Sequence, residues 1–140
     1  MQFRQLIQSD IEYMAQHALV GRESWKNQSG EAQYNFTLEH EGKILGIGGF
    51  IMVGKTCAIS WFDMTEDAKE HIITSYRVLK EWADIFCKDH GIQRLMAFVR
   101  TGYEAGVRTC EHLGYRFENR MPKYEDGQPF DLFVKFFDGV

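Results

Sequence analysis

The sequence predicts an α/β fold of the α+β type, in which helices flank a mixed, mostly antiparallel central sheet that contains one parallel pair of strands. Three observations lead to this prediction. A three-stranded antiparallel meander fills residues 34–62, a long amphipathic helix spans Glu66 to His90, and a buried strand, Leu95 to Val99, follows that helix directly. Because a helix between two strands of one sheet forms a crossover, the strands on either side of it should be parallel.

The first half of the chain reads as strand, helix and meander. Met1 to Leu6 alternates like a short strand, and Ser9 is the expected N-cap of the next helix. Two strand patterns meet at Glu41-Gly42, and the second of them, Ile44 to Met52, is rich in glycine. Glycine inside a strand indicates either a bulge or a place where another group approaches the backbone closely. The third strand is expected from Thr56 to Phe62.

The second half begins with the long helix, which Gly91 should terminate. The strand Leu95 to Val99 then leads into a short helix, and this connection predicts one ligand-sized notch at the carboxyl end of the strand. The last strand carries Leu132, Val134 and Phe136 after an Asp126-Gly127 turn. Its apolar alternation favours pairing with a second chain at a sheet edge, so a homodimer is a possible assembly.

Composition narrows the class of protein. A chain of 140 residues with 44% hydrophobic content predicts one domain over residues 1–140. The net charge of -4 argues against a nucleic-acid partner, since phosphate contacts need a clustered basic face. Because no apolar run reaches membrane-spanning length, we expect no membrane partner and a soluble, cytoplasmic protein. The three cysteines and five histidines lack ligand spacing, which predicts no metal.

Over essentially its whole length the chain resembles the GNAT (Gcn5-related N-acetyltransferase) superfamily. The resemblance lies in the order of the elements and in two segments. The first is the hairpin EGKILGIGGF at Glu41 to Phe50, and the second is GYEAGVRTCEHLGYRFEN at Gly102 to Asn119. The second segment is similar to the short helix behind the acetyl-CoA site and the "LGF" start of the next strand in that family. The resemblance implies a GNAT-like fold and an acetyl-CoA-dependent N-acyltransferase that transfers an acetyl group to an amine.

The resemblance also implies where acetyl-CoA would lie. It places the coenzyme between the strands that end at Phe62 to Met64 and at Val99 to Arg100, with its pyrophosphate on the amino terminus of the long helix. Unpaired backbone N–H groups and the helix dipole favour anions there. The residues implied to contact the coenzyme are Phe62, Met64, Lys69, His71, Ile72, Arg100 and Arg108.

The phosphate loop of the family, QxxGxG or RxxGxG, aligns with Asp67 to Ile72 and departs from the pattern. Glu70 replaces the first glycine and Ile72 the second small residue. Carboxylates at Glu66, Asp67 and Glu70 each favour the helix by roughly 0.3–1 kcal/mol through its dipole, but they repel a diphosphate. Lys69, His71 and Arg77 would compensate if they turned inward. The alternative interpretation is a structural helix with no phosphate on it.

Two residues are candidates for acid–base catalysis. Cys110 occupies the position where many members of the family have a tyrosine that reprotonates the coenzyme thiolate, although a lone cysteine is more commonly a buried small hydrophobe. Asp63 is the candidate general base, with Glu39 and His40 as alternatives. The spacing of Asp63 and Glu66 also suits a helix capping box.

The acceptor is expected to be a small-molecule or peptide amine, whose identity variable loops set in this family, here Gly21 to Gln33 and Asn119 to Pro129. A second hypothesis stays open, namely a non-catalytic GNAT-like binding or assembly protein that has lost the phosphate loop. The degraded loop and the segment DGQPFDLFVKF are also similar to small GNAT-like proteins encoded by tailed bacteriophages.

Overall fold

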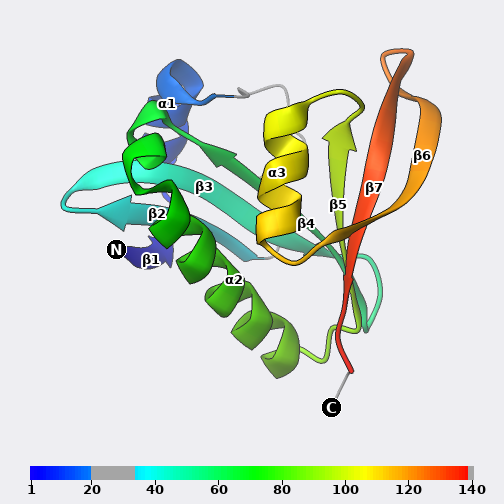
Figure 1. Ribbon diagram of the computed structural model, residues 1–140. Helices are drawn as coiled ribbons and strands as arrows, with labels where there is room; N and C mark the ends of the chain where they lie inside the picture. The colour runs from blue at the N-terminus through cyan, green and yellow to red at the C-terminus, as the bar shows by residue number, and fades with distance from the viewer. Residues whose placement is uncertain (20–33, 139–140) are drawn as a thin grey trace. The chain divides into compact units, whose positions relative to one another are not determined.

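The computed structural model describes residues 1–19 and 34–138, and Figure 1 labels their helices and strands. The chain forms two compact units. Unit 1 comprises Met1–Met52 and Ser60–Ser75, and unit 2 comprises Val53–Ile59 and Tyr76–Val140. We describe each unit by itself, and a single domain over residues 1–140 stays a prediction.

Unit 1 is an antiparallel sheet with one helix packed on it. Its complete elements are β1 (Gln2–Gln5), α1 (Gln8–His17), β2 (Tyr34–His40), β3 (Lys43–Met52) and the 3-10 helix η2 (Glu66–His71). It also holds the second part of β4 (Cys57–Met64) and the first turn of α2 (Ile72–Asp89). Met14 of α1 and Ile47 of β3 are fully buried against each other, with Trp61 and other partly buried apolar side chains around them.

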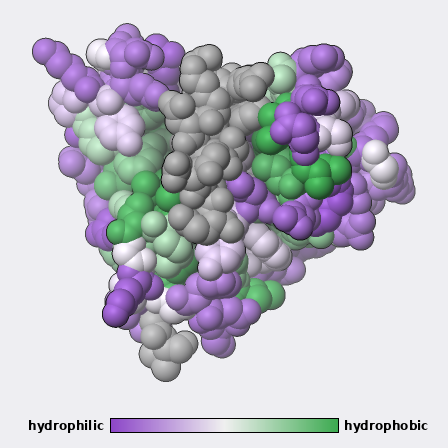
Figure 2. All heavy atoms as spheres, turned by 180° about the vertical axis from the view of Figure 1, so that it is seen from behind, coloured by the Kyte–Doolittle hydropathy of each residue, from purple (hydrophilic) through white to green (hydrophobic). Residues whose placement is uncertain are grey.

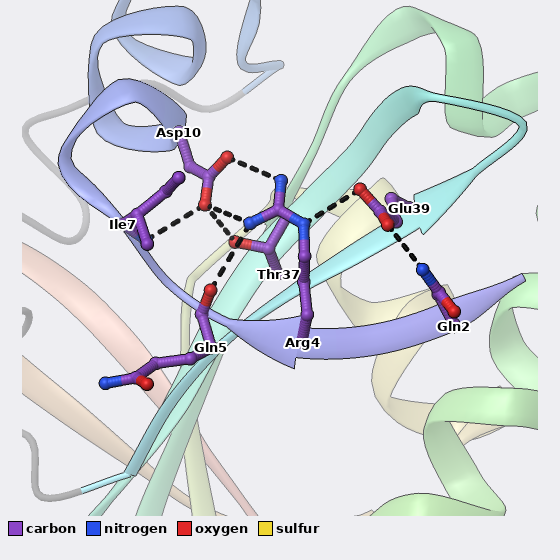
Figure 3. Close-up of polar contacts among 7 residues, drawn as sticks. All are labelled: Gln2, Arg4, Gln5, Ile7, Asp10, Thr37 and Glu39. Carbon is purple, nitrogen blue, oxygen red and sulfur yellow. Dashed lines mark hydrogen bonds and ion pairs between the residues drawn. The ribbon is translucent and has the colours of Figure 1, made fainter.

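The start of α1 differs from the prediction. The helix begins at Gln8 with Ile7 in the N-cap position, and Ser9 lies inside its first turn. The carboxylate of Asp10 accepts a hydrogen bond from the N–H of Ile7 at 3.0 Å, which makes Asp10 the capping side chain (Figure 3). The prediction of Ser9 as the N-cap was therefore wrong. Asp10 is held in the capping position by Arg4 and Thr37 as well, and a local sequence pattern does not show these contacts.

The predicted hairpin is confirmed, and so is the reason for its glycines. Glu41 and Gly42 form the turn with φ angles of 50° and 79°. A Cβ on Gly46 would lie 2.6 Å from a ring atom of Phe62 and from the carbonyl oxygen of Asp63, and one on Gly48 would lie 2.6 Å from the carbonyl oxygen of Trp61. The glycines of β3 thus allow close approach of β4.

Unit 2 contains the parallel pair. Cys57, Ala58 and Ile59 of β4 pair with β5 (Arg94–Arg100) in parallel, as the crossover predicts. The other elements are α3 (Glu104–His112), β6 (Arg116–Glu125) and β7 (Gln128–Phe136). β4 has residues in both units. The hydrogen-bonded strand order is β1-β2-β3-β4-β5-β7-β6. The GNAT-like mixed sheet with one parallel pair is therefore confirmed.

The long predicted helix is two helices in succession. Residues 66–71 wind as the 3-10 helix η2, and the α-helix begins only at Ile72. Thr65 fixes this junction, because its hydroxyl donates to the carbonyl oxygen of Ile44 at 2.9 Å and its N–H donates to that of Leu45, also at 2.9 Å. Gly91, with a φ of 68°, ends α2 as predicted.

β5 and β7 are apolar on both faces. On one face Gly106 of α3 packs against Val99 so closely that a Cβ on the glycine would lie 2.7 Å from the valine Cγ1. On the other face the paired side chains Phe98 and Leu132 are half-buried. Figure 2 shows the apolar side chains of this second face as a green patch on its left side. Burial of one face and partial burial of the other account for the continuous hydrophobic run in these strands.

The last strand does not lie at an edge. β7 pairs with β5 on one side and with β6 on the other, so the prediction of a free edge at Leu132 to Phe136 was wrong. The edge strand is β6, which carries two register shifts, Pro122, and Lys123 with a φ of 54°. These features hinder pairing between sheet edges. A homodimer remains a prediction, but it cannot form through pairing of β7 with a second chain.

Candidate functional site

The end of β4 in unit 1 holds three of the predicted site residues. The ring of Phe62 stacks at 6.0 Å on that of Phe36 and covers the glycines of β3. Asp63 is buried, with 3% of its surface exposed. The carbonyl oxygen of Met64 accepts a hydrogen bond from the N–H of Leu19 at 2.8 Å. The ring of Phe62 is thus held by packing and the backbone of Met64 by a hydrogen bond, and precise binding sites are built on fixed positions of this kind.

Asp63 does not cap the helix that follows. The N-cap residue of η2 is Thr65, so the capping-box interpretation of Asp63 with Glu66 was wrong. Glu66 instead forms an ion pair with Lys69 on the exposed surface, where Nζ of Lys69 lies 3.2 Å from Oε1 of Glu66. The positive charge of Lys69 is therefore already partly balanced by a neighbour in the same segment.

Two acidic side chains of η2, Asp67 and Glu70, lie beside the β2–β3 hairpin. They line a hollow of about 280 Å³, together with both histidines of the region. The lining residues are His40, Glu41, Lys43, Leu45, Asp67, Glu70 and His71. The rings of His40 and His71 meet edge to face, with centroids 4.8 Å apart. The sequence contains no signal for this contact between residues 31 positions apart.

Unit 2 holds the remaining candidates on β5 and α3. Arg100 ends β5 with an exposed side chain, and its carbonyl oxygen accepts the N–H of Tyr103 at 3.0 Å. Arg108 is also exposed on α3, where its guanidinium lies 4.0 Å from the carboxylate of Glu104. Both arginines are accessible to an anionic ligand.

Cys110 lies on α3 one residue before Glu111 and is buried, with 7% of its surface exposed. Burial, with a smaller contribution from the charge of Glu111, raises the pKa of its thiol to about 12. The thiol therefore keeps its proton at neutral pH, as an acid must. Release of that proton to a thiolate of ordinary pKa, about 8.5, is energetically uphill.

A polar contact between α2 and α3 was not predicted. The hydroxyl of Tyr76 lies 3.0 Å from that of Thr109, one residue before Cys110, and the Tyr76 ring stacks on His112 with centroids 4.9 Å apart. Apolar spacing on α2 marks Tyr76 only as a core-facing position, so a sequence pattern does not show its hydroxyl partner.

The predicted residues fall into two groups, each within its own unit. Unit 1 contains Phe62, Asp63, Met64, Lys69, His71 and Ile72, and unit 2 contains Arg100, Arg108 and Cys110. Of the two predicted acceptor loops, residues 21–33 lie outside the described residues. Asn119 to Pro129 is not a loop, since most of it forms β6, the Asp126-Gly127 turn and the start of β7.

The described residues contain neither a metal-binding cluster nor a membrane-spanning helix. Within residues 1–19 and 34–138 no group of three or more His, Cys, Asp or Glu side chains is arranged to hold a metal ion. None of the helices in those ranges has the length and apolarity needed to cross a membrane.

Comparison with solved structures identifies the fold. The ribosomal-protein-S18-alanine N-acetyltransferase of Escherichia coli matches 95% of this chain and 91% of its own, with a TM-score of 0.72 and 19% identity. A variant of the spermidine N-acetyltransferase of Vibrio cholerae matches 97% and 95%, with a TM-score of 0.73 and 11% identity. The chain thus has the GNAT fold predicted from its sequence.

A third match carries a ligand. A putative acetyltransferase from Salmonella typhimurium, solved with its cofactor acetyl-CoA, matches 98% of this chain and 94% of its own, with a TM-score of 0.70 and 13% identity. No protein-family model matches the sequence, and no curated protein sequence matches it significantly. At these identities the likeness establishes the fold, and the activity is a matter for proposal.

Proposed function

We propose that this protein is an acetyl-CoA-dependent N-acetyltransferase that acetylates a small-molecule or peptide amine. One observation carries the proposal: the fold matches N-acetyltransferases along more than nine-tenths of both chains, including a structure with acetyl-CoA. The named neighbours include enzymes for spermidine and for a ribosomal protein. An amine is the acceptor group that the two classes of substrate share.

The coenzyme residues follow from the resemblance and from the geometry within each unit. In unit 1 we assign the backbone of Phe62 and Met64 to the thioester end and His71, Ile72 and Lys69 to the diphosphate. The carboxylates of Asp67 and Glu70 line the hollow beside the hairpin. In unit 2 we assign the exposed guanidinium groups of Arg100 and Arg108 to coenzyme phosphates.

Acetyl-CoA supplies the acetyl group as an activated thioester. In the proposed reaction the carboxylate of Asp63 takes a proton from the acceptor ammonium, directly or through a water molecule, which frees the nitrogen lone pair for attack. Backbone N–H groups at the end of β4 polarise the carbonyl under attack. The thiol of Cys110 gives its proton to the departing sulfur.

Calorimetric titration with acetyl-CoA tests the proposal, combined with a thermal shift at the same coenzyme concentrations. We expect micromolar binding and the rise in melting temperature that mass action requires. A spectrophotometric assay of free thiol release with a panel of polyamines and amino-terminal peptides then identifies the acceptor. Absence of binding at millimolar coenzyme would contradict the proposal and favour a binding or assembly role. Cytoplasmic localisation and an origin among phage proteins remain predictions.

A further inference from the structure

The contact between His40 and His71 in unit 1 joins two elements. His40 ends β2, His71 ends η2, and their rings meet at 70° with centroids 4.8 Å apart. The Nδ1 atom of His40 is buried and has no hydrogen-bond partner. A packed pair of imidazoles with a buried, unpaired nitrogen is sensitive to the arrival of a proton, because the charge must be balanced by the groups around it.

The groups that face this pair are mostly acidic. The hairpin contributes Glu41 and Lys43, and η2 contributes Asp67 and Glu70. The Oε1 atom of Glu41 lies 3.9 Å from His40 Nε2. Among the described residues Asp67, Glu70 and Lys43 have no ion-pair partner within 4.0 Å. With neutral imidazoles the hollow therefore holds three carboxylates and one ammonium group, which is a net charge of -2.

The remaining charges near the pair are already engaged. Glu66 and Lys69 of η2 form an ion pair at 3.2 Å. Glu39 of β2 accepts hydrogen bonds from Arg4 and Gln2 on the opposite side of the strand end. A proton on either of the two histidines would therefore reduce the net negative charge of the hollow in unit 1.

We propose that protonation of the His40–His71 pair strengthens coenzyme binding by cancelling the negative charge beside the diphosphate segment. The inference rests on the proposed function, which assigns His71, Ile72 and Lys69 to the diphosphate. Imidazole is the side chain whose charge ordinarily changes between pH 5 and 8. Two imidazolium rings in contact repel each other, and the first proton therefore contributes most of the change.

The test is a set of calorimetric titrations with acetyl-CoA at pH 6 and pH 8 and constant ionic strength. For the unmodified protein we expect a dissociation constant about three- to tenfold lower at pH 6, the size of one added charge near a phosphate in a solvated site. The double substitution His40→Gln with His71→Gln removes both imidazoles and should reduce this ratio to nearly one. His17→Gln is the matched control on α1 and should keep the ratio of the unmodified protein, since His17 stacks on Tyr13 instead.

A second variant tests the same cause without a histidine. The double substitution Asp67→Asn with Glu70→Gln removes two carboxylates from the hollow, and at pH 8 it should bind acetyl-CoA about three- to tenfold more tightly than the unmodified protein. Far-UV circular dichroism verifies that each variant is folded. The coenzyme phosphates take up protons equally in all titrations, so the comparison between variants isolates the contribution of the protein.

The possible results separate the two proposals. Equal affinity at both pH values, a ratio that the double histidine variant leaves intact, or no gain in the Asp67→Asn, Glu70→Gln variant overturns the role of the histidine pair and leaves the proposed function standing. Failure of the unmodified protein to bind acetyl-CoA at either pH overturns the proposed function, and this inference with it.

Discussion

Arg4 forms a bidentate ion pair with Asp10 through both terminal nitrogens of its guanidinium group. Nη1 lies 2.8 Å from Oδ2 of Asp10, and Nη2 lies 2.8 Å from Oδ1 (Figure 3). The same carboxylate accepts the hydroxyl of Thr37 at 2.8 Å and the N–H of Ile7. Asp10 is only 1% exposed. One buried carboxylate therefore joins β1, the start of α1 and β2.

Removal of that carboxylate should strongly destabilise the protein. Asp10→Ala leaves the guanidinium of Arg4 without its buried partner and the hydroxyl of Thr37 without its acceptor. We expect the free energy of unfolding to fall by about 3 kcal/mol, the lower end for a broken buried ion pair because Arg4 is partly exposed. Urea denaturation measures it. Glu12→Ala, an exposed position on the same helix, is the control and should change stability by less than about 0.5 kcal/mol.

The same carboxylate should make stability depend on acid pH. Burial alone raises the pKa of Asp10, but hydrogen bonds from Arg4, Ile7 and Thr37 outweigh burial and hold that pKa below its ordinary value. A lowered folded-state pKa stabilises the native protein above the unfolded pKa, about 3.9, and this contribution is lost as the pH falls through the folded value.

Urea denaturation at pH 7, 5, 4 and 3 checks this dependence. The unmodified protein should lose stability below about pH 4, and Asp10→Asn should show a flatter curve over the same interval. Asp138→Asn serves as the control, because Asp138 is exposed and should leave the curve unchanged. Parallel curves for the unmodified protein and Asp10→Asn would assign the acid sensitivity to other carboxylates.

The order of elements could be predicted from the sequence because it depends on local periodicity and on turns. Gly42, Gly91, Asp126 and Gly127 adopt positive φ angles, which glycine and, less often, aspartate tolerate. The predicted helix starts were wrong where a residue distant in the sequence determines the local structure. Thr65 is held by the backbone of β3, and residues 66–71 after it form a 3-10 helix that no local pattern separates from the α-helix that follows.

The candidate site was predictable only as positions in a resemblance. The alignment of Cys110 with a family tyrosine follows from Leu113-Gly114-Tyr115, but the burial that raises the pKa of its thiol is a property of the packed helix. The contact between His40 and His71 depends on where the hairpin meets η2, and neither residue has a local pattern that indicates the other. Tertiary contacts of this kind need the folded structure.

The glycines of β3 give a third prediction. Gly46→Ala places a Cβ 2.6 Å from the carbonyl oxygen of Asp63 and from the ring of Phe62, so β3 and β4 must separate. Because backbone cannot move aside as a flexible side chain does, we expect a loss of about 3 kcal/mol in unfolding free energy. Gly54→Ala is the control, because its Cβ would lie 4.0 Å from its nearest neighbour, Cys57 Cβ. Equal stability of the two variants would contradict the proposed close approach.

The last prediction separates two roles for Cys110. This chain offers a matched control in Cys87 on α2, which is fully buried and whose thiol pKa burial likewise raises to about 12. Substitution of either cysteine by alanine should reduce the free energy of unfolding by about 1 kcal/mol through lost packing. If Cys110 is the proton donor, Cys110→Ala should also lower kcat, whereas Cys87→Ala should not.

We expect kcat to fall about tenfold in Cys110→Ala with KM for acetyl-CoA unchanged, below the usual range for a general acid because proton release from so basic a thiol is costly. Acetylation assays across pH 6–9 with the acceptor found in the amine screen measure this effect. If Cys110→Ala and Cys87→Ala lose the same stability and both keep full kcat, Cys110 is a packing residue. The proton would then reach the departing sulfur from another group, and Tyr76, whose hydroxyl lies beside Thr109, is the next residue to substitute.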